Sequence, residues 1–159
     1  MEINKKIKIL LIGPYLPPYG GVSVHISRLV GLLQNEFNLD FIDESPVKKK
    51  AYFNIRSLNV FKYIRKITAC DVLYIHSGTN ILRCIHIITG KLFVKKTILV
   101  LHGFSSKPDK LTALFNGKIY RLADSIVVAN HTIAEVFRIP THAYVVKEAF
   151  LPPDMSKEP

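Results

Sequence analysis

Six short runs of Val, Ile and Leu alternate along this chain with segments whose apolar residues recur at helical spacing. The runs are nearly continuous in apolar residues, which is typical of strands covered on both faces in a parallel sheet. Right-handed β-α-β connections then favour an α/β fold: a Rossmann-like, doubly wound, mostly parallel sheet with helices on both faces. Strands are expected at 7–13, 39–42, 72–76, 97–102, 125–129 and 143–146, and helices at 22–35, 55–68, 79–93, 110–122 and 131–137.

The length of the chain indicates how many domains it holds, and its net charge indicates which partners it favours. Its 159 residues are a one-domain length, and residues 1–150 carry the whole strand and helix pattern. Residues 151–159 begin with Leu151-Pro152-Pro153 and read as the start of an inter-domain linker or a tail. The formal net charge of +10 favours an anionic partner, such as a phosphorylated ligand or a lipid head group.

A glycine pair follows the first apolar run and opens the first expected helix. Gly20 and Gly21 place bare backbone N–H groups at a helix N-terminus, where an anion can approach. The chain lacks the G-x-G-x-x-G fingerprint of dinucleotide-binding folds and the lysine of a P-loop. The pair therefore indicates a phosphate contact outside the dehydrogenase and NTPase classes.

Histidines gather where the expected strands end. In a parallel sheet ligands bind beyond the carboxyl ends of the strands, and His76, His102 and Asn130-His131 all lie at such ends. We expect no metal site, because His76, His102 and His131 have no carboxylate or thiolate near them at ligand spacing. No cofactor is expected either. Cys70 and Cys84 suggest no disulfide framework, which favours a reducing, cytoplasmic location.

Taken in order, these motifs resemble the N-terminal domain of GT-B glycosyltransferases of the family 4 type, which are retaining nucleotide-sugar enzymes. The resemblance covers nearly the whole chain. It rests on the segments 8–12, 20–25, 71–76, 99–103, 123–128 and 148–153. The chain departs from the family at Asn130, where serine is common. It also ends about where the inter-domain linker of these enzymes begins, so the C-terminal donor-binding domain is expected to be absent.

The resemblance implies a role for each candidate residue. It places Gly20, Gly21 and Gly103 against the phosphate and sugar of the donor, with His102 beside the reaction centre as the catalytic residue. It makes this domain the acceptor-binding half, with His25, His76 and Asn130 as acceptor-binding residues. Structural roles stay open: His25 as a packed histidine, His102 as a strand-end histidine bonded to backbone, and Asn130 as a helix N-cap.

A basic segment gives the chain a candidate membrane surface. Between Val47 and Lys66 there is no acidic residue, and aromatic Tyr52 and Phe53 adjoin the lysine run. This pattern favours docking on the inner face of an anionic membrane, although a solvated face of an ordinary helix also fits. The expected docking residues are Lys48, Lys49, Lys50, Arg56, Lys62, Arg65 and Lys66, with Val60, Phe61, Ile64 and Ile67 as the opposite, apolar stripe.

Two functions remain open on the sequence alone. One is the acceptor-side half of a glycosyltransferase that moves a sugar from a nucleotide-sugar donor to a carbohydrate or lipid-linked acceptor, inactive alone. The other is a non-catalytic membrane- or partner-binding subunit of a split transferase. Nucleic acid is not an expected partner, because the aromatic residues are not arrayed along a strand face as stacking platforms.

Overall fold

The strands form one seven-stranded, fully parallel sheet in the computed structural model, which describes residues 6–17, 20–47, 51–103 and 108–146. Its order is β3-β2-β1-β4-β5-β6-β7. The strands are β1 (Lys8–Gly13), β2 (Asn38–Asp43), β3 (Phe53–Asn54), β4 (Val72–Ile75), β5 (Lys96–Leu101), β6 (Ser125–Val128) and β7 (Val145–Val146). The α/β, Rossmann-like prediction is confirmed.

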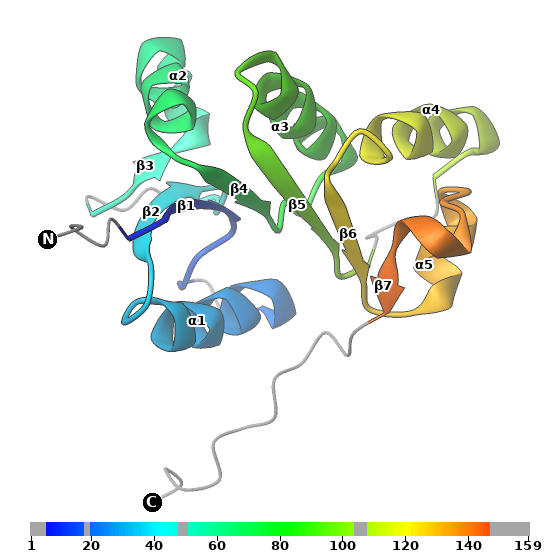
Figure 1. Ribbon diagram of the computed structural model, residues 1–159, viewed down its shortest axis with the longest axis horizontal. Helices are drawn as coiled ribbons and strands as arrows, with labels where there is room; N and C mark the ends of the chain where they lie inside the picture. Colours follow the sequence, from blue (N-terminus) through cyan, green and yellow to red (C-terminus); the bar gives the residue numbers. More distant parts are fainter. Residues whose placement is uncertain (1–5, 18–19, 48–50, 104–107, 147–159) are drawn as a thin grey trace, which may run out of the picture.

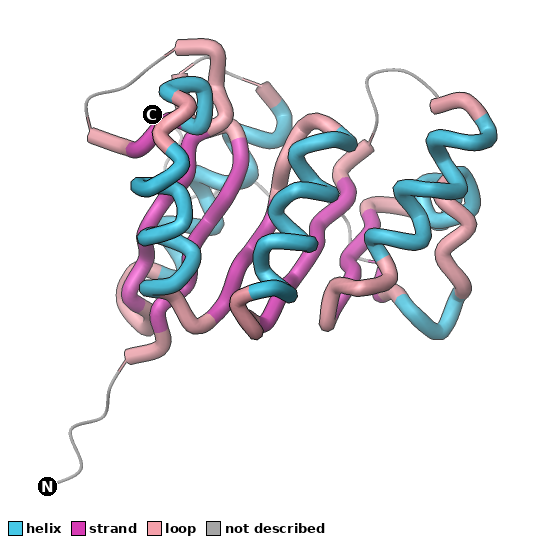
Figure 2. Tube along the Cα trace, turned by 90° about the horizontal axis from the view of Figure 1, so that it is seen from above, coloured by secondary structure: helices cyan, strands magenta, loops and turns pink. Residues whose placement is uncertain are grey.

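Helices cover both faces of the sheet. Figure 1 shows α1 on one face and α2, α3 and α4 side by side on the other, and Figure 2 shows the helices layered against the strands. The helices are α1 (Gly21–Leu33), α2 (Val60–Ala69), α3 (Asn80–Leu92), α4 (Lys110–Tyr120) and α5 (His131–Val136), with short 3-10 turns at Ile55–Ser57 and Thr141–Ala143. The core between the layers is aliphatic, with Leu10, Ile12, Leu73, Ile75, Leu99 and Leu101 all fully buried.

The strand order reverses between β1 and β4, and this reversal positions the site. The chain runs outward from β1 through β2 and β3, then returns to place β4 on the other side of β1. In open α/β sheets, a ligand crevice forms at this point, beyond the carboxyl ends of the strands. Gly13 ends β1 there, and the backbone N–H of His76, just after β4, donates to the carbonyl oxygen of Ile12 across 2.7 Å.

The expected helix over 55–68 is wrong in its first turn. Residues 53–54 form the short strand β3, and a 3-10 turn follows before α2 begins at Val60. The side chain of Asn54 accepts a hydrogen bond from the Arg56 backbone N–H, and the side chain of Asn59 accepts one from the Lys62 N–H. Asparagine side chains at both positions compete with helical pairing, so the helix starts at the second cap.

The predicted apolar stripe of α2 is wrong for two residues. Tyr63 and Ile67 are buried against the sheet, whereas Val60 and Phe61 face solvent and Phe61 is 91% exposed. Tyr63 and Ile67 are four residues apart and share the face that meets the sheet, whereas Phe61 lies on another side of the helix and Val60 is its first residue. The last expected strand, 143–146, also shortens to Val145–Val146, because a 3-10 turn takes up residues 141–143.

Candidate functional site

Three histidines from three separate elements meet at the carboxyl edge of the sheet. His76 and His102 are the first residues after β4 and β5, and His25 lies on α1. Nδ1 of His76 and Nε2 of His102 lie 2.9 Å apart. The ring centroid of His25 is 5.5 Å from that of His76 and 4.9 Å from that of His102. We call these residues the histidine cluster.

Gly13 allows the histidine cluster to form at the end of β1. A Cβ atom on Gly13 would stand 2.8 Å from Cδ1 of Ile26 and 3.1 Å from Cβ of His76. Both contacts are tighter than a side chain normally accepts, so a larger residue would require Ile26 and the end of β4 to shift, whereas glycine leaves the close approach unstrained. The sequence analysis assigned no such role to Gly13.

Burial keeps the rings of His76 and His102 neutral. Desolvation, followed by the neighbouring imidazoles of His102 and His25, holds the pKa of His76 well below its usual value. The pKa of His102 falls to about 4 because of burial, the adjacent His25 and the Arg83 guanidinium. Desolvation always disfavours the charged imidazolium, and a nearby positive charge adds to the effect. At neutral pH these two rings therefore serve as hydrogen-bonding groups or ligands and not as cations.

A buried arginine braces the loop that follows His102, and sequence reasoning missed it. Arg83 is only 2% exposed. It donates from Nε to the carbonyl oxygen of Ser77, from Nη1 to Oδ1 of Asn80 and from Nη2 to the carbonyl oxygen of Gly103. In the sequence it looks like a charge that interrupts an apolar helix. A buried arginine is rare without partners, and that rarity is the signal that could have identified it.

The glycine turn supplies part of the predicted anion site. Gly20 is the N-cap of α1, and its N–H already donates to Oγ of Ser23 across 2.9 Å. The N–H groups of Gly21 and Val22 belong to the first turn, where an α-helix leaves its donors outside the helical ladder. A Cβ atom on Gly103 would meet no atom of the described residues within 4 Å.

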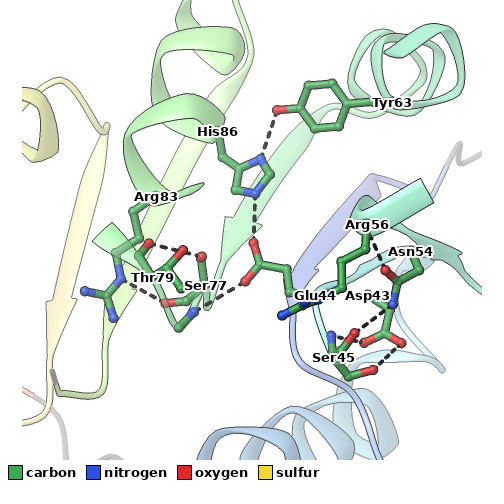
Figure 3. Close-up of polar contacts among 11 residues, drawn as sticks. Asp43, Glu44, Ser45, Asn54, Arg56, Tyr63, Ser77, Thr79, Arg83 and His86 are labelled. Carbon is green, nitrogen blue, oxygen red and sulfur yellow. Dashed lines mark hydrogen bonds and ion pairs between the residues drawn. The ribbon is translucent and has the colours of Figure 1, made fainter. Parts of the chain in front are cut away.

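A second polar network runs beneath the edge (Figure 3). Nε2 of His86 lies 2.9 Å from Oε1 of Glu44, and Nδ1 of His86 lies 2.9 Å from the Tyr63 hydroxyl. The other carboxylate oxygen of Glu44 accepts a hydrogen bond from the Gly78 N–H. Glu44 and His86 are both buried. This network links α2 and α3 to the turns after β2 and β4, and it supports the edge without contacting the histidine cluster in any described hydrogen bond.

Asn130 caps a helix and makes no described hydrogen bond to the histidine cluster. Its Oδ1 accepts the Ile133 backbone N–H of α5 across 3.1 Å, as the structural alternative predicted. The adjacent His131 bonds through Nδ1 to the Tyr144 hydroxyl at 2.9 Å and is exposed. The structure therefore joins His25, His76 and His102, and it leaves Asn130 and His131 in a separate cap.

The basic segment only partly forms the surface that its sequence suggests. Lys48, Lys49 and Lys50 lie outside the described residues. Lys66 forms an ion pair with Asp40 of β2, and Phe53 is buried, with Lys62 over its ring. Tyr52 is half-buried and packs edge-on against Tyr15 and Phe41. Arg56, Lys62 and Arg65 remain as exposed basic side chains.

An apolar face accompanies these basic residues, and the sequence analysis did not predict its extent. Phe61 and Val60 of α2 are exposed, and so are Ile81, Ile85, Ile88 and Leu92 along the outer side of α3. A groove of about 440 Å³ lies between the two helices and is lined by residues that include Val60, Tyr63 and Ile85. We call Val60, Phe61 and the four α3 residues the α2–α3 face. No helix in the described parts of the chain is long and apolar enough to cross a membrane.

Comparison with known proteins identifies the fold. No protein-family model and no curated protein sequence matches this chain. Among solved structures, it is similar to Anabaena Alr3699/HepE in complex with UDP, with a TM-score of 0.58 and 13% identity, over 88% of this chain and 43% of that one. HepE in complex with UDP-glucose gives the same TM-score at 14% identity, over 88% and 43%.

A further similar structure is an α-glucosyltransferase in complex with UDP and a 13-mer DNA. The TM-score is 0.56 at 16% identity, over 78% of this chain and 37% of that one. The chain thus spans less than half the length of each of these proteins. At such low identity the likeness concerns the fold alone: this chain has the Rossmann-like α/β fold of one part of each of these structures.

Proposed function

We propose that this chain is the acceptor-side half of a GT-B glycosyltransferase of the family 4 type. It would contribute to transfer of a sugar from a nucleotide-sugar donor to a carbohydrate or lipid-linked acceptor. One observation carries the proposal: neutral His102 and the glycine-capped start of α1 belong to the same carboxyl edge, at the strand-order reversal of a fold that binds UDP-glucose in Alr3699/HepE.

Each group at the carboxyl edge of the sheet would have a distinct role in this reaction. The N–H groups of Gly21 and Val22 would face the donor diphosphate, where the positive end of the α1 dipole favours negative charge. Neutral His102, held by His76, would hydrogen-bond the reacting sugar and fix its orientation. Arg83 would keep the loop after His102 in place through the Gly103 carbonyl. His25, on the solvent side of the cluster, would contact the acceptor.

Titration of the chain with UDP-glucose, followed by amide NMR, tests the donor contact. A few N–H groups give few contacts, so we expect a Kd of about 1 mM or weaker, which is about 4 kcal/mol or less. The shifts should centre on Gly21, His102 and Gly103 and disappear in Gly21→Val. Micromolar binding would contradict the half-enzyme proposal, because the chain would then hold a complete nucleotide site. Shifts elsewhere would contradict the site.

Activity tests the role of His102 once the chain is paired with a donor-binding half. We expect His102→Ala to lower kcat/KM at least about 100-fold, a loss of about 2.7 kcal/mol. The matched control is His131→Ala, since His131 lies in the separate cap of α5. Transfer by His102→Ala at the control level would show that this histidine is structural.

The α2–α3 face favours a second candidate function, docking on an anionic membrane. It combines exposed apolar side chains with nearby Arg56, Lys62 and Arg65, which is the composition of an interfacial surface. Each basic group near an anionic surface contributes about 1 kcal/mol before screening. A membrane-bound subunit without transferase activity would need this face and not the histidine cluster.

Vesicle sedimentation separates this candidate from a solvated helix face. Phe61→Ser should weaken binding to phosphatidylglycerol vesicles about 10-fold or more, since burying such a ring contributes about 1.5–3 kcal/mol. Leu32→Ser is the matched control, because Leu32 is exposed on α1, across the sheet. Equal binding to neutral and anionic vesicles, or no effect of Phe61→Ser, would exclude docking through this face.

A further inference from the structure

The histidine cluster has the geometry of a metal-binding triad. One ligand nitrogen from each of His25, His76 and His102 lies within 4.8 Å of the other two. The rings come from α1 and from the ends of β4 and β5, so their backbones are fixed by regular structure. We propose that these three residues bind a first-row transition metal ion, with Zn²⁺ as the expected ion. The inference rests on geometry alone and does not depend on the proposed transferase.

The spacing of the rings fits one tetrahedral ion. With Zn–N bonds of about 2.0–2.1 Å, and each ring centroid about 1 Å beyond its ligand nitrogen, two imidazoles on one ion have centroids about 5 Å apart. The centroid distances here are 4.9, 5.2 and 5.5 Å for the three pairs. The centroid distances of all three pairs are therefore close to the spacing expected for imidazoles on one ion. Binding would require rotations of the side chains rather than movement of the strands.

A proton now occupies the contact that the ion would take. Nδ1 of His76 and Nε2 of His102, 2.9 Å apart, share one hydrogen. A bound ion would replace this hydrogen, and the ring that loses it would stay neutral by carrying its proton on its other nitrogen. Nε2 of His76 is buried and has no hydrogen-bond partner among the described residues. The ring of His76 is therefore held by a single described hydrogen bond, which the metal ion would replace with a stronger contact.

The surroundings select the kind of ion. Imidazole ligands suit Zn²⁺, Ni²⁺ and Cu²⁺, whereas Mg²⁺ and Ca²⁺ require oxygen ligands. The histidine cluster offers nitrogen ligands only, and the Arg83 guanidinium acts electrostatically on His102. The ion would be held by coordination to the three imidazole nitrogens and not by attraction to negatively charged side chains. His25 and His102 are half-buried, so a fourth position faces solvent and would take water or an anion.

Direct metal titration of the purified 159-residue chain tests the inference without any nucleotide sugar. Competition with a chromogenic chelator should give one Zn²⁺ per chain and no binding of Mg²⁺. His25→Gln and His102→Gln, both at the solvent side, should each weaken the Kd for Zn²⁺ at least about 30-fold. The matched control His131→Gln removes a histidine outside the cluster and should leave the Kd unchanged.

Imidazole NMR of the wild-type chain answers the question even if a variant fails to fold. Zn²⁺ should shift the ring ¹⁵N signals of His25, His76 and His102 together and leave that of His131 unchanged. Zn²⁺ binding that is equally strong in wild type, His25→Gln and His102→Gln would place the ion elsewhere and overturn the inference. So would the lack of any binding at millimolar Zn²⁺. Neither result bears on the proposed UDP-glucose contact, which the UDP-glucose titration tests separately.

Discussion

Arg83 donates a hydrogen bond across 3.2 Å to the carbonyl oxygen of Gly103, and this contact joins α3 to the backbone directly after His102. The same guanidinium holds the carbonyl oxygen of Ser77, which directly follows His76. One side chain therefore bridges the backbone directly after His76 and directly after His102. The position of these histidines depends on α3 as much as on their own strands.

Replacing Arg83 should destabilise the chain strongly. Arg83→Met keeps the apolar stem but removes the donor to the Ser77 and Gly103 carbonyl oxygens and one of the two donors to Oδ1 of Asn80, at a cost of about 2–4 kcal/mol. Urea unfolding measures the loss. Arg121→Met is the control, because Arg121 is exposed and donates only to its own helix, so its effect should stay within about 0.5 kcal/mol. Equal losses would mean that the Arg83 bridge is not structural.

The Tyr63–His86–Glu44 network should act as one unit. Tyr63→Phe removes a buried hydrogen bond and should cost about 1 kcal/mol, whereas His86→Phe leaves the buried Glu44 carboxylate with the Gly78 N–H as its one described partner and should cost about 3 kcal/mol. The two losses should be non-additive by about 0.5–1 kcal/mol in a double-mutant cycle. Tyr144→Phe, at an exposed tyrosine–histidine pair, is the control for loss of a hydroxyl. Additive losses would contradict a coupled network.

Two helical glycines should respond in opposite ways to alanine. A Cβ atom on Gly117 of α4 would lie 1.8 Å from the carbonyl oxygen of Phe137, so Gly117→Ala should cost more than about 3 kcal/mol by forcing α4 from the backbone after α5. At Gly31 of α1 the new Cβ would meet nothing within 4 Å, so Gly31→Ala should stabilise by about 0.5–1 kcal/mol. Thermal unfolding of both variants checks the signs, and a stable Gly117→Ala would contradict the packing.

Both thiols should be unreactive in the folded chain. Burial raises the pKa of Cys70 to about 11 and also raises that of Cys84. At pH 8 a thiol of pKa 11 is only about 0.1% thiolate, and thiolate is the reactive species. A chromogenic disulfide reagent should therefore label the native chain at least about 100-fold more slowly than the chain in guanidinium. Rapid labelling without denaturant would show that Cys70 or Cys84 is accessible.

The sequence predicted most of the residues at the carboxyl edge of the sheet, but not the buried polar side chains that hold them in place. The apolar runs predicted where β4 and β5 end, so the meeting of His76 and His102 followed from parallel pairing alone. His25 joined them because α1 begins at the predicted glycine turn. Arg83, Glu44 and His86 gave no comparable signal, since their roles depend on side chains that meet across 20 to 42 residues of sequence. The acceptor-binding role of Asn130 stays a prediction, and its side chain caps α5.

Hydropathy by itself determined the layered α/β architecture, because continuous Val and Ile runs have their lowest free energy in a sheet covered on both faces. Local chemistry determined the Asn130 cap in the same way. Tertiary structure alone decided which side of α2 packs on the sheet, with Tyr63 and Ile67 buried and Phe61 exposed. It alone decided the three-histidine geometry as well, because close approach at Gly13 sets the distance between α1 and β4, and no sequence spacing encodes a distance between separate elements.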